Sequence, residues 1–197
     1  MNNGDVSQSR RRFLIGATSV VGGVGVVGAA VPFVASWNPS AKAKAAGAPV
    51  SVNISKIEPG QQITVEWRGK PVWVVRRTET MLENIEKLND RLKDPMSEEA
   101  DQPPYIEGIY RALRDEYLVT VGICTHLGCS PTYRPEVAPA DLGENWLGGF
   151  YCACHGSRYD LSGRVYANQP APSNLVIPPY RYEGEDTLTV GLDPEAV

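Results

Sequence analysis

The sequence predicts a mainly β, antiparallel domain that contains one helix and follows an N-terminal transmembrane helix. Three observations lead to this fold class. Short runs rich in β-branched residues recur between residues 50 and 192, one segment repeats apolar residues at helical spacing, and residues 13–37 form an apolar run without a charged side chain. At 197 residues, the chain is long enough for one ordinary core beyond that apolar run.

The apolar run 13–37 is long enough to cross a bilayer. As a helix it would measure about 37 Å, against about 30 Å for a hydrocarbon core. Its glycines would let a neighbouring helix approach closely in lipid. A cleaved secretory signal is the alternative interpretation, but the apolar part of such signals is usually shorter, about 7–15 residues. We therefore expect the helix to be retained.

Three arginines, Arg10, Arg11 and Arg12, stand directly before the apolar run. The positive-inside rule then places the N-terminus in the cytoplasm and the body across the membrane. The same residues resemble a bacterial twin-arginine export signal, an address for proteins exported after folding. Residues 1–12 are thus expected to be a cytoplasmic signal region. Residues 38–49, which lack large apolar side chains and are bounded by prolines, are expected to be a tether.

The body is expected to be mostly strand. Its β-branched runs are 50–54, 62–67, 72–76, 117–123, 175–177 and 187–192, with a further strand-like run at 149–151. A helix is predicted at about 80–93, from Met81 and its helically spaced apolar partners, with a capping box of Thr80 and Glu83. Residues 96–104 and 133–146 are expected to be surface loops, the second an excursion of unassigned role.

Charge and cysteine content narrow the possible functions. The net charge of -4 argues against a nucleic-acid partner, because such a partner favours a basic face. Four cysteines are too few for a disulfide scaffold, so their roles depend on their spacing.

Every cysteine and histidine of the chain lies in one of two short boxes, C-T-H-L-G-C at 124–129 and C-A-C-H-G-S-R-Y at 152–159. This confinement indicates a shared metal site. One zinc ion would accept two cysteines and two histidines but would leave two cysteines unexplained. A two-iron cluster held by two thiolates and two imidazoles explains the pattern better, and its lower negative charge raises the reduction potential.

The two boxes resemble those of the Rieske [2Fe–2S] proteins of ubiquinol–cytochrome c oxidoreductase, respiratory complex III. The resemblance implies a Rieske-type antiparallel sheet domain at 50–197, with a small cluster-binding subdomain at about 122–174 and one [2Fe–2S] cluster. It implies that Cys124 and Cys152 bind the buried iron and that His126 and His155 bind the outer iron. The remaining cysteines would form a disulfide between the two loops, Cys129 with Cys154.

The resemblance also assigns roles around the cluster. The hydroxyls of Ser157 and Tyr159 would donate to a bridging sulfide and to the Cys124 sulfur, which favours the reduced state. Leu127 would lie at the tip where partners dock. Pro170 belongs to a proline loop, Q-P-A-P at 169–172, in which Gln169 replaces the usual glycine and leaves the local backbone conformation open.

The function implied by the resemblance is electron transfer in a respiratory quinol–cytochrome c reductase, a translocase of which this chain is one subunit. The chain would take one electron from quinol, with a proton on a cluster histidine, mainly His155 with His126 beside it, and pass the electron to a c-type cytochrome. Implied partners are cytochrome b and c-type cytochrome subunits in a dimeric complex. The expected location is the bacterial inner membrane, single-pass, with the cluster domain periplasmic.

Two alternatives remain open at this stage. The chain could be the Rieske subunit of another exported oxidoreductase, such as arsenite oxidase. It could also be a zinc-binding structural domain that transfers no electron.

Overall fold

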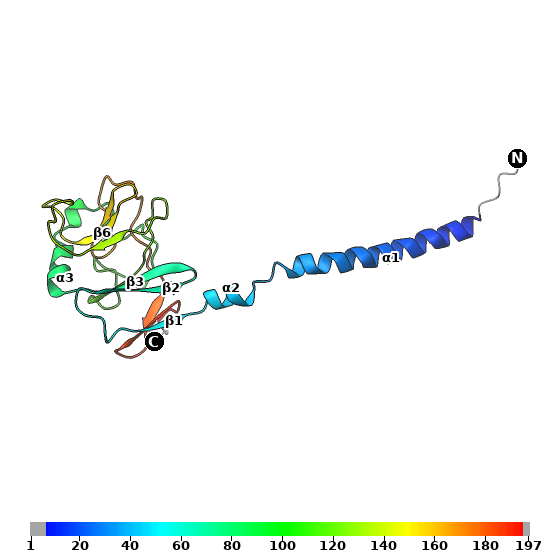
Figure 1. Ribbon diagram of the computed structural model, residues 1–197, viewed down its shortest axis with the longest axis horizontal. Coiled ribbons are helices and arrows are strands. Elements are labelled where there is room, and N and C mark those ends of the chain that lie inside the picture. Colours follow the sequence, from blue (N-terminus) through cyan, green and yellow to red (C-terminus); the bar gives the residue numbers. More distant parts are fainter. Residues whose placement is uncertain (1–6, 195–197) are drawn as a thin grey trace. The chain divides into compact units, whose positions relative to one another are not determined.

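The computed structural model describes residues 7–194, and the chain forms two compact units, residues 1–45 and 46–197 (Figure 1). The first contains the helix α1 (Gln8–Ala35), which has no buried residue. Among the described residues, α1 is the one helix long and apolar enough to cross a membrane. It begins before residue 13, so that Arg10 to Arg12 lie in its first turns, whereas residues 1–6 of the expected signal region lie outside the described part.

A second short helix, α2 (Ala41–Ala46), lies within the segment expected to be a tether. Lysine and alanine alternate in it, and both are good helix formers. It is preceded by Ser40, whose hydroxyl accepts a hydrogen bond from the amide of Ala43 at 3.1 Å. Local propensity and this capping contact account for the turn of helix.

The described part of the second unit contains three antiparallel sheets of three strands each. The first, in the order β1-β9-β8, contains β1 (Val50–Asn53), β9 (Thr187–Val190) and β8 (Tyr180–Tyr182). The second, in the order β2-β3-β4, contains β2 (Gln62–Trp67), β3 (Lys70–Arg76) and β4 (Tyr117–Val121). The third, in the order β5-β6-β7, contains β5 (Thr132–Arg134), β6 (Gly149–Cys152) and β7 (Ser157–Tyr159).

The second sheet supplies much of the core. All five residues of β4 are buried, as are four consecutive residues of β3, so these strands are covered on both faces. Strands β2 and β3 are joined by the two-residue turn Arg68 and Gly69, both with positive φ, 52° and 70°. This geometry matches the twist of a tight hairpin.

Two predictions about secondary structure are corrected. Residues 175–177 form no strand, because their amides bond to separate segments: Leu175 to the Gly163 carbonyl and Ile177 to the Asp101 carbonyl. The helix predicted at 80–93 is α3 (Glu79–Glu86), followed by the short 3₁₀ helix η1 (Asn89–Arg91). The cap is not the predicted capping box.

The helix α3 starts one residue earlier than the prediction. Its N-cap is Thr78, whose hydroxyl accepts a hydrogen bond from the amide of Met81 at 3.3 Å. Thr80 and Glu83 both lie inside the helix, so they cannot form its cap. The apolar repeat continues through Leu88 and Leu92, which are buried although the α-helix has ended.

The segment 133–146 lies on the surface, as predicted, with most of residues 136–145 exposed, but two of its side chains anchor it to the domain. It begins in β5, and Leu142 and Trp146 are buried. The Trp146 indole donates a hydrogen bond to the Arg134 carbonyl at 3.1 Å and stacks on Tyr166. The Arg134 guanidinium binds both carboxylate oxygens of Asp141. The segment therefore folds back and packs as part of the domain.

An aromatic pair joins the second sheet to the third. Trp73 of β3 stacks on Phe150 of β6, with ring centroids 5.1 Å apart. A methyl group on Gly122 would lie 2.2 Å from the Trp73 ring, so this approach requires glycine there. The contact fixes the third sheet, which carries the candidate site, against the core.

Three buried arginines, Arg77, Arg111 and Arg164, bond to residues 160–163 just after β7. Arg164 pairs with the buried carboxylate of Asp160 at 2.7 Å. Arg77 and Arg111 bond mainly to backbone carbonyls, and burial lowers the pKa of each to about 10, a shift that the Asp160 charge opposes. This network holds the chain that leaves the third sheet.

Candidate metal centre

The two cysteine–histidine boxes form two loops built in the same way. In the first, the amide of Gly128 bonds back to the Cys124 carbonyl at 3.0 Å; in the second, that of Gly156 bonds back to the Cys152 carbonyl at 2.9 Å. Both glycines have φ near 80°, which suits glycine and strains other residues. Each loop thus turns tightly within four residues of its first cysteine.

The two loops place their thiols inside and their imidazoles outside. Cys124 and Cys152 are each 2% exposed, and neither is in a disulfide. Burial raises the pKa of Cys152, and a hydrogen bond with Cys124 adds to the shift. His126 is half-buried and His155 exposed, with ring centroids 4.7 Å apart. The four side chains predicted as ligands are therefore gathered at one site, arranged from interior to surface.

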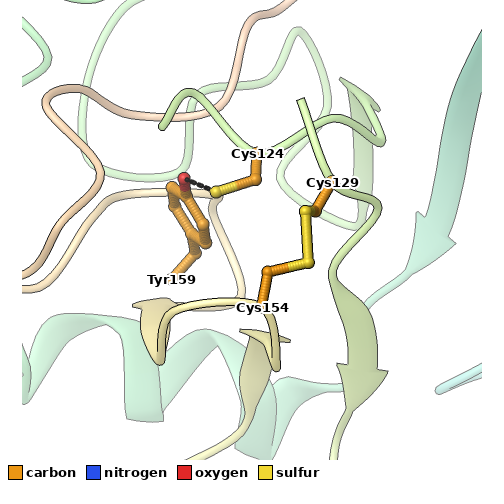
Figure 2. The surroundings of a disulfide bond; sticks show 4 residues. All are labelled: Cys124, Cys129, Cys154 and Tyr159. Atoms are coloured by element: carbon orange, nitrogen blue, oxygen red, sulfur yellow. Dashed lines mark hydrogen bonds between the residues drawn. A yellow bond between two sulfur atoms is a disulfide. The ribbon is translucent and has the colours of Figure 1, made fainter. Parts of the chain in front are cut away.

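The other two cysteines form the Cys129–Cys154 disulfide, which crosses from one loop to the other (Figure 2). Their sulfur atoms lie within 4.8 Å of the Cys152 sulfur, but disulfide sulfurs offer no thiolate to a metal. Within the described residues, the bond leaves two thiols and two imidazoles as the soft ligands of the boxes.

Tyr159 of β7 lies against the inner thiol, and Figure 2 shows its hydroxyl facing the Cys124 sulfur, 3.2 Å away. That hydroxyl accepts a hydrogen bond from the Thr125 amide at 3.1 Å. Burial raises the pKa of Tyr159 above its usual range, and the bond to Cys124 raises it further. The phenol therefore stays protonated at neutral pH and can donate to the sulfur.

Sequence reasoning missed Thr125. Its hydroxyl lies 3.1 Å from that of Tyr159 and donates to the Ser173 carbonyl at 2.7 Å, which ties the first loop to the segment after the proline loop. The motif shows a threonine between two ligand positions but gives no indication of this contact. The repeated glycine four residues after Cys124 and Cys152 was a visible signal for the shared loop geometry.

Ser157 connects the second loop to the proline loop. Its hydroxyl oxygen accepts a hydrogen bond from the Ala171 amide at 3.1 Å, which leaves its proton available for donation. The left-handed residue here is Asn168, directly before the proline loop, with φ 57°, and not Gln169. Asparagine tolerates this conformation, so glutamine at 169 is accommodated.

Two further predicted residues lie on the surface. Leu127 is 71% exposed at the tip of the first loop, and Pro170 is exposed in the proline loop. An exposed leucine beside two imidazoles is an apolar contact point at the accessible edge of the site.

The residues present fit a two-iron, two-sulfide cluster with mixed ligands. Two buried thiols suit one iron, two outward imidazoles suit the other, and the Tyr159 and Ser157 hydroxyls can donate to sulfur. The donor set alone would also satisfy one tetrahedral zinc ion. Comparison with known proteins distinguishes the two.

Tyr159→Phe is expected to lower the midpoint potential of the cluster by on the order of 50 mV, because the lost hydrogen bond is worth about 1 kcal/mol more in the reduced state. The potential is measured by redox titration of the electron paramagnetic resonance (EPR) signal. Tyr166→Phe is the matched control, since the buried Tyr166 hydroxyl has no hydrogen-bond partner among the described residues. Equal potentials in both variants would contradict a role for the Tyr159 hydroxyl.

Two family models match the chain. The model described as "Rieske [2Fe-2S] domain" matches residues 49–181, and the one described as "Ubiquitinol-cytochrome C reductase Fe-S subunit TAT signal" matches residues 1–40. The first covers the second and third sheets, both loops and strand β1, but ends within β8 and before β9; the second covers α1.

Curated relatives match over nearly their full length. A ubiquinol-cytochrome c reductase iron-sulfur subunit of Allochromatium vinosum is 58% identical, over 95% of this chain and 91% of the relative. Proteins of the same description from Rhodospirillum rubrum and Bradyrhizobium diazoefficiens are 41% and 40% identical, each over 93% of this chain and over 92% and 94% of the relatives. A solved chain titled "Hyperthermophilic respiratory Complex III" aligns with a TM-score of 0.49 and 29% identity, over 90% of this chain and 98% of that one. The chain belongs to the family of ubiquinol–cytochrome c reductase iron–sulfur subunits, whose Rieske domain carries a [2Fe–2S] cluster.

Proposed function

We propose that the inner iron is bound by Cys124 and Cys152 and the outer iron by His126 and His155. The observation that carries this proposal is the combination of two buried free thiols with two converging imidazoles, the other two cysteines being paired with each other. The cluster, when bound, supplies a one-electron carrier of raised potential. The side chains around it tune that potential and set which edge partners can reach.

The chain is the electron-transfer subunit of a ubiquinol–cytochrome c reductase. On our proposal, the exposed ring nitrogen of His155, with His126 beside it, hydrogen-bonds the quinol hydroxyl and takes its proton as one electron is transferred. The exposed Leu127 packs against the partner that docks there. The buried thiols and Tyr159 exclude water from the inner side, so exchange is confined to the imidazole edge.

The finer assignment of location and partners is also proposed. Helix α1 fits a membrane-anchored subunit, and the arginines of its first turn favour a cytoplasmic N-terminus. The cluster domain then lies on the periplasmic side of the bacterial inner membrane. Residues 38–49 are the tether between α1 and the cluster domain, and the partners are cytochrome b and a c-type cytochrome in a dimeric complex.

The two alternatives are not favoured. Relatives matched over nearly their whole length are described as subunits of ubiquinol–cytochrome c reductase, and not of another exported oxidoreductase. A structural zinc domain would accept the same four ligands but gives no reason for the hydroxyl of Tyr159 beside Cys124.

Low-temperature EPR of the ascorbate-reduced protein, followed through a redox titration, tests the proposal. The expected result is a Rieske-type spectrum with a positive midpoint potential, because quinol oxidation requires an acceptor of raised potential. A clearly negative midpoint would contradict the quinol-oxidising role. Stoichiometric zinc without iron or inorganic sulfide in a fully loaded preparation would overturn the ligand assignment as well.

A further inference from the structure

The Cys152 thiol lies next to the Cys129–Cys154 disulfide. The three sulfur atoms lie within 4.8 Å of one another, and Cys152 is itself free and buried. One residue separates Cys152 from Cys154 in the second loop, while Cys129 comes from the first. A free, buried thiol therefore lies in the immediate neighbourhood of a disulfide.

The other free thiol does not share this position. Cys124 is not part of the group of three sulfurs, and Figure 2 shows its side chain directed toward Tyr159 and away from the disulfide. Its sulfur lies 3.2 Å from the Tyr159 hydroxyl. Of the two proposed thiolate ligands, only Cys152 is placed to react with the disulfide.

We propose that Cys152 and the Cys129–Cys154 bond form a thiol–disulfide exchange site, which opens when Cys152 no longer binds iron. This inference rests on the proposed ligand set. The Cys152 thiolate attacks the Cys129 sulfur, a Cys152–Cys129 bond forms, and the Cys129–Cys154 bond breaks. Cys154 leaves as a thiolate and takes up the proton that Cys152 lost. The numbers of thiols and disulfides are unchanged, so the step needs no oxidant.

Iron ligation then protects the native disulfide. A Cys152 sulfur bound to iron is held in place and cannot attack. The match of residues 1–40 to a twin-arginine signal indicates export after folding, and disulfides form outside the cytoplasm. The order of events follows: Cys152 is occupied before the bond forms, so Cys129 and Cys154 pair with each other. In a chain exported without its cluster, Cys152 is free and can compete for the same disulfide partners.

The test compares the full-length protein, in detergent, with and without its cluster. Iron is removed by a chelator under argon, and the sample is held for several hours at about pH 8.5, near the ordinary thiol pKa. Acid quenching, alkylation with N-ethylmaleimide and mass spectrometry of peptides then identify each free and bonded cysteine. We expect only the Cys129–Cys154 bond in the loaded protein. In the cluster-free protein we expect its partial loss, with a Cys152–Cys129 bond and alkylation of Cys154.

Two single variants make the test specific. Cluster-free Cys124→Ser should exchange as the wild type does, whereas Cys152→Ser should keep only the native bond. The proposal is overturned if the cluster-free wild type retains only the Cys129–Cys154 bond. It is overturned equally if Cys124 enters new bonds as often as Cys152, since unfolding would then explain the exchange. A preparation lacking iron and sulfide would contradict the proposed function, yet the exchange could still be read in it.

Discussion

Cys124→Ala is expected to abolish the Rieske EPR signal and, in the assembled complex, quinol–cytochrome c reductase activity. Its sulfur is one of two buried thiols available to the inner iron, and a cluster that loses a thiolate there has no replacement among the described neighbours. The measurement is the iron and sulfide content of the purified protein together with its EPR spectrum. This is the largest effect we expect from any single substitution.

The matched control replaces both disulfide cysteines, Cys129→Ala with Cys154→Ala. These residues are bonded to each other, so their loss should leave the cluster signal present while the loops become less constrained. A wild-type signal in Cys124→Ala would contradict the ligand assignment. Loss of all iron in the double variant, with Cys124→Ala still loaded, would reverse the roles of the two cysteine pairs.

Gly149→Ala is expected to destabilise the domain by on the order of 3 kcal/mol, because an added methyl group would overpack a buried position. That methyl would lie 1.9 Å from the Tyr159 carbonyl oxygen, a backbone atom that cannot rotate aside. Strands β6 and β7 must therefore separate, which displaces Tyr159 of β7 and its hydroxyl from the Cys124 sulfur. Thermal unfolding followed by circular dichroism measures the destabilisation, and the midpoint potential should fall in the same variant.

Gly184→Ala is the control for Gly149→Ala. Gly184 has φ of 79° and open space around it, so alanine there meets only the backbone preference, about 1 kcal/mol. Equal melting temperatures for the two variants would show that β6 and β7 tolerate separation. A melting temperature for Gly149→Ala equal to that of the wild type would contradict the close contact itself.

The sequence predicted the elements whose signal is local. The strand β2 was predicted at its observed bounds, because polar and apolar residues alternate along it and it ends at a turn that contains Gly69. The start of α3 was misplaced, since several threonines and glutamates could form a cap and only packing selects Thr78. Residues 175–177 have the composition of a strand, but their backbone hydrogen-bond partners lie in three separate segments of the chain. Composition carries no information about such partners.

The candidate site was predictable to a similar extent. The spacing of the two boxes predicted one shared site, and in the folded chain the two histidine rings are in contact and two cysteines remain free and buried, while their role as ligands stays a prediction. The hydrogen bonds of Thr125 and of the buried Arg111 were not predictable. Threonine and arginine side chains are usually exposed to solvent, and nothing in the sequence marks these two as exceptions. Both act by bonding to carbonyl groups far away in sequence, a property of the folded chain only.

The inside-to-outside order of the four proposed ligands has a consequence for electron exchange. Cys124 and Cys152 are covered, so the edge formed by His126 and His155 is the accessible side of the site within the described residues. On the proposed ligand assignment, the electron donor and the electron acceptor dock at this same histidine edge, and neither can bind while the other is bound. Loading and unloading are then separate visits, and saturating either partner should competitively inhibit the other.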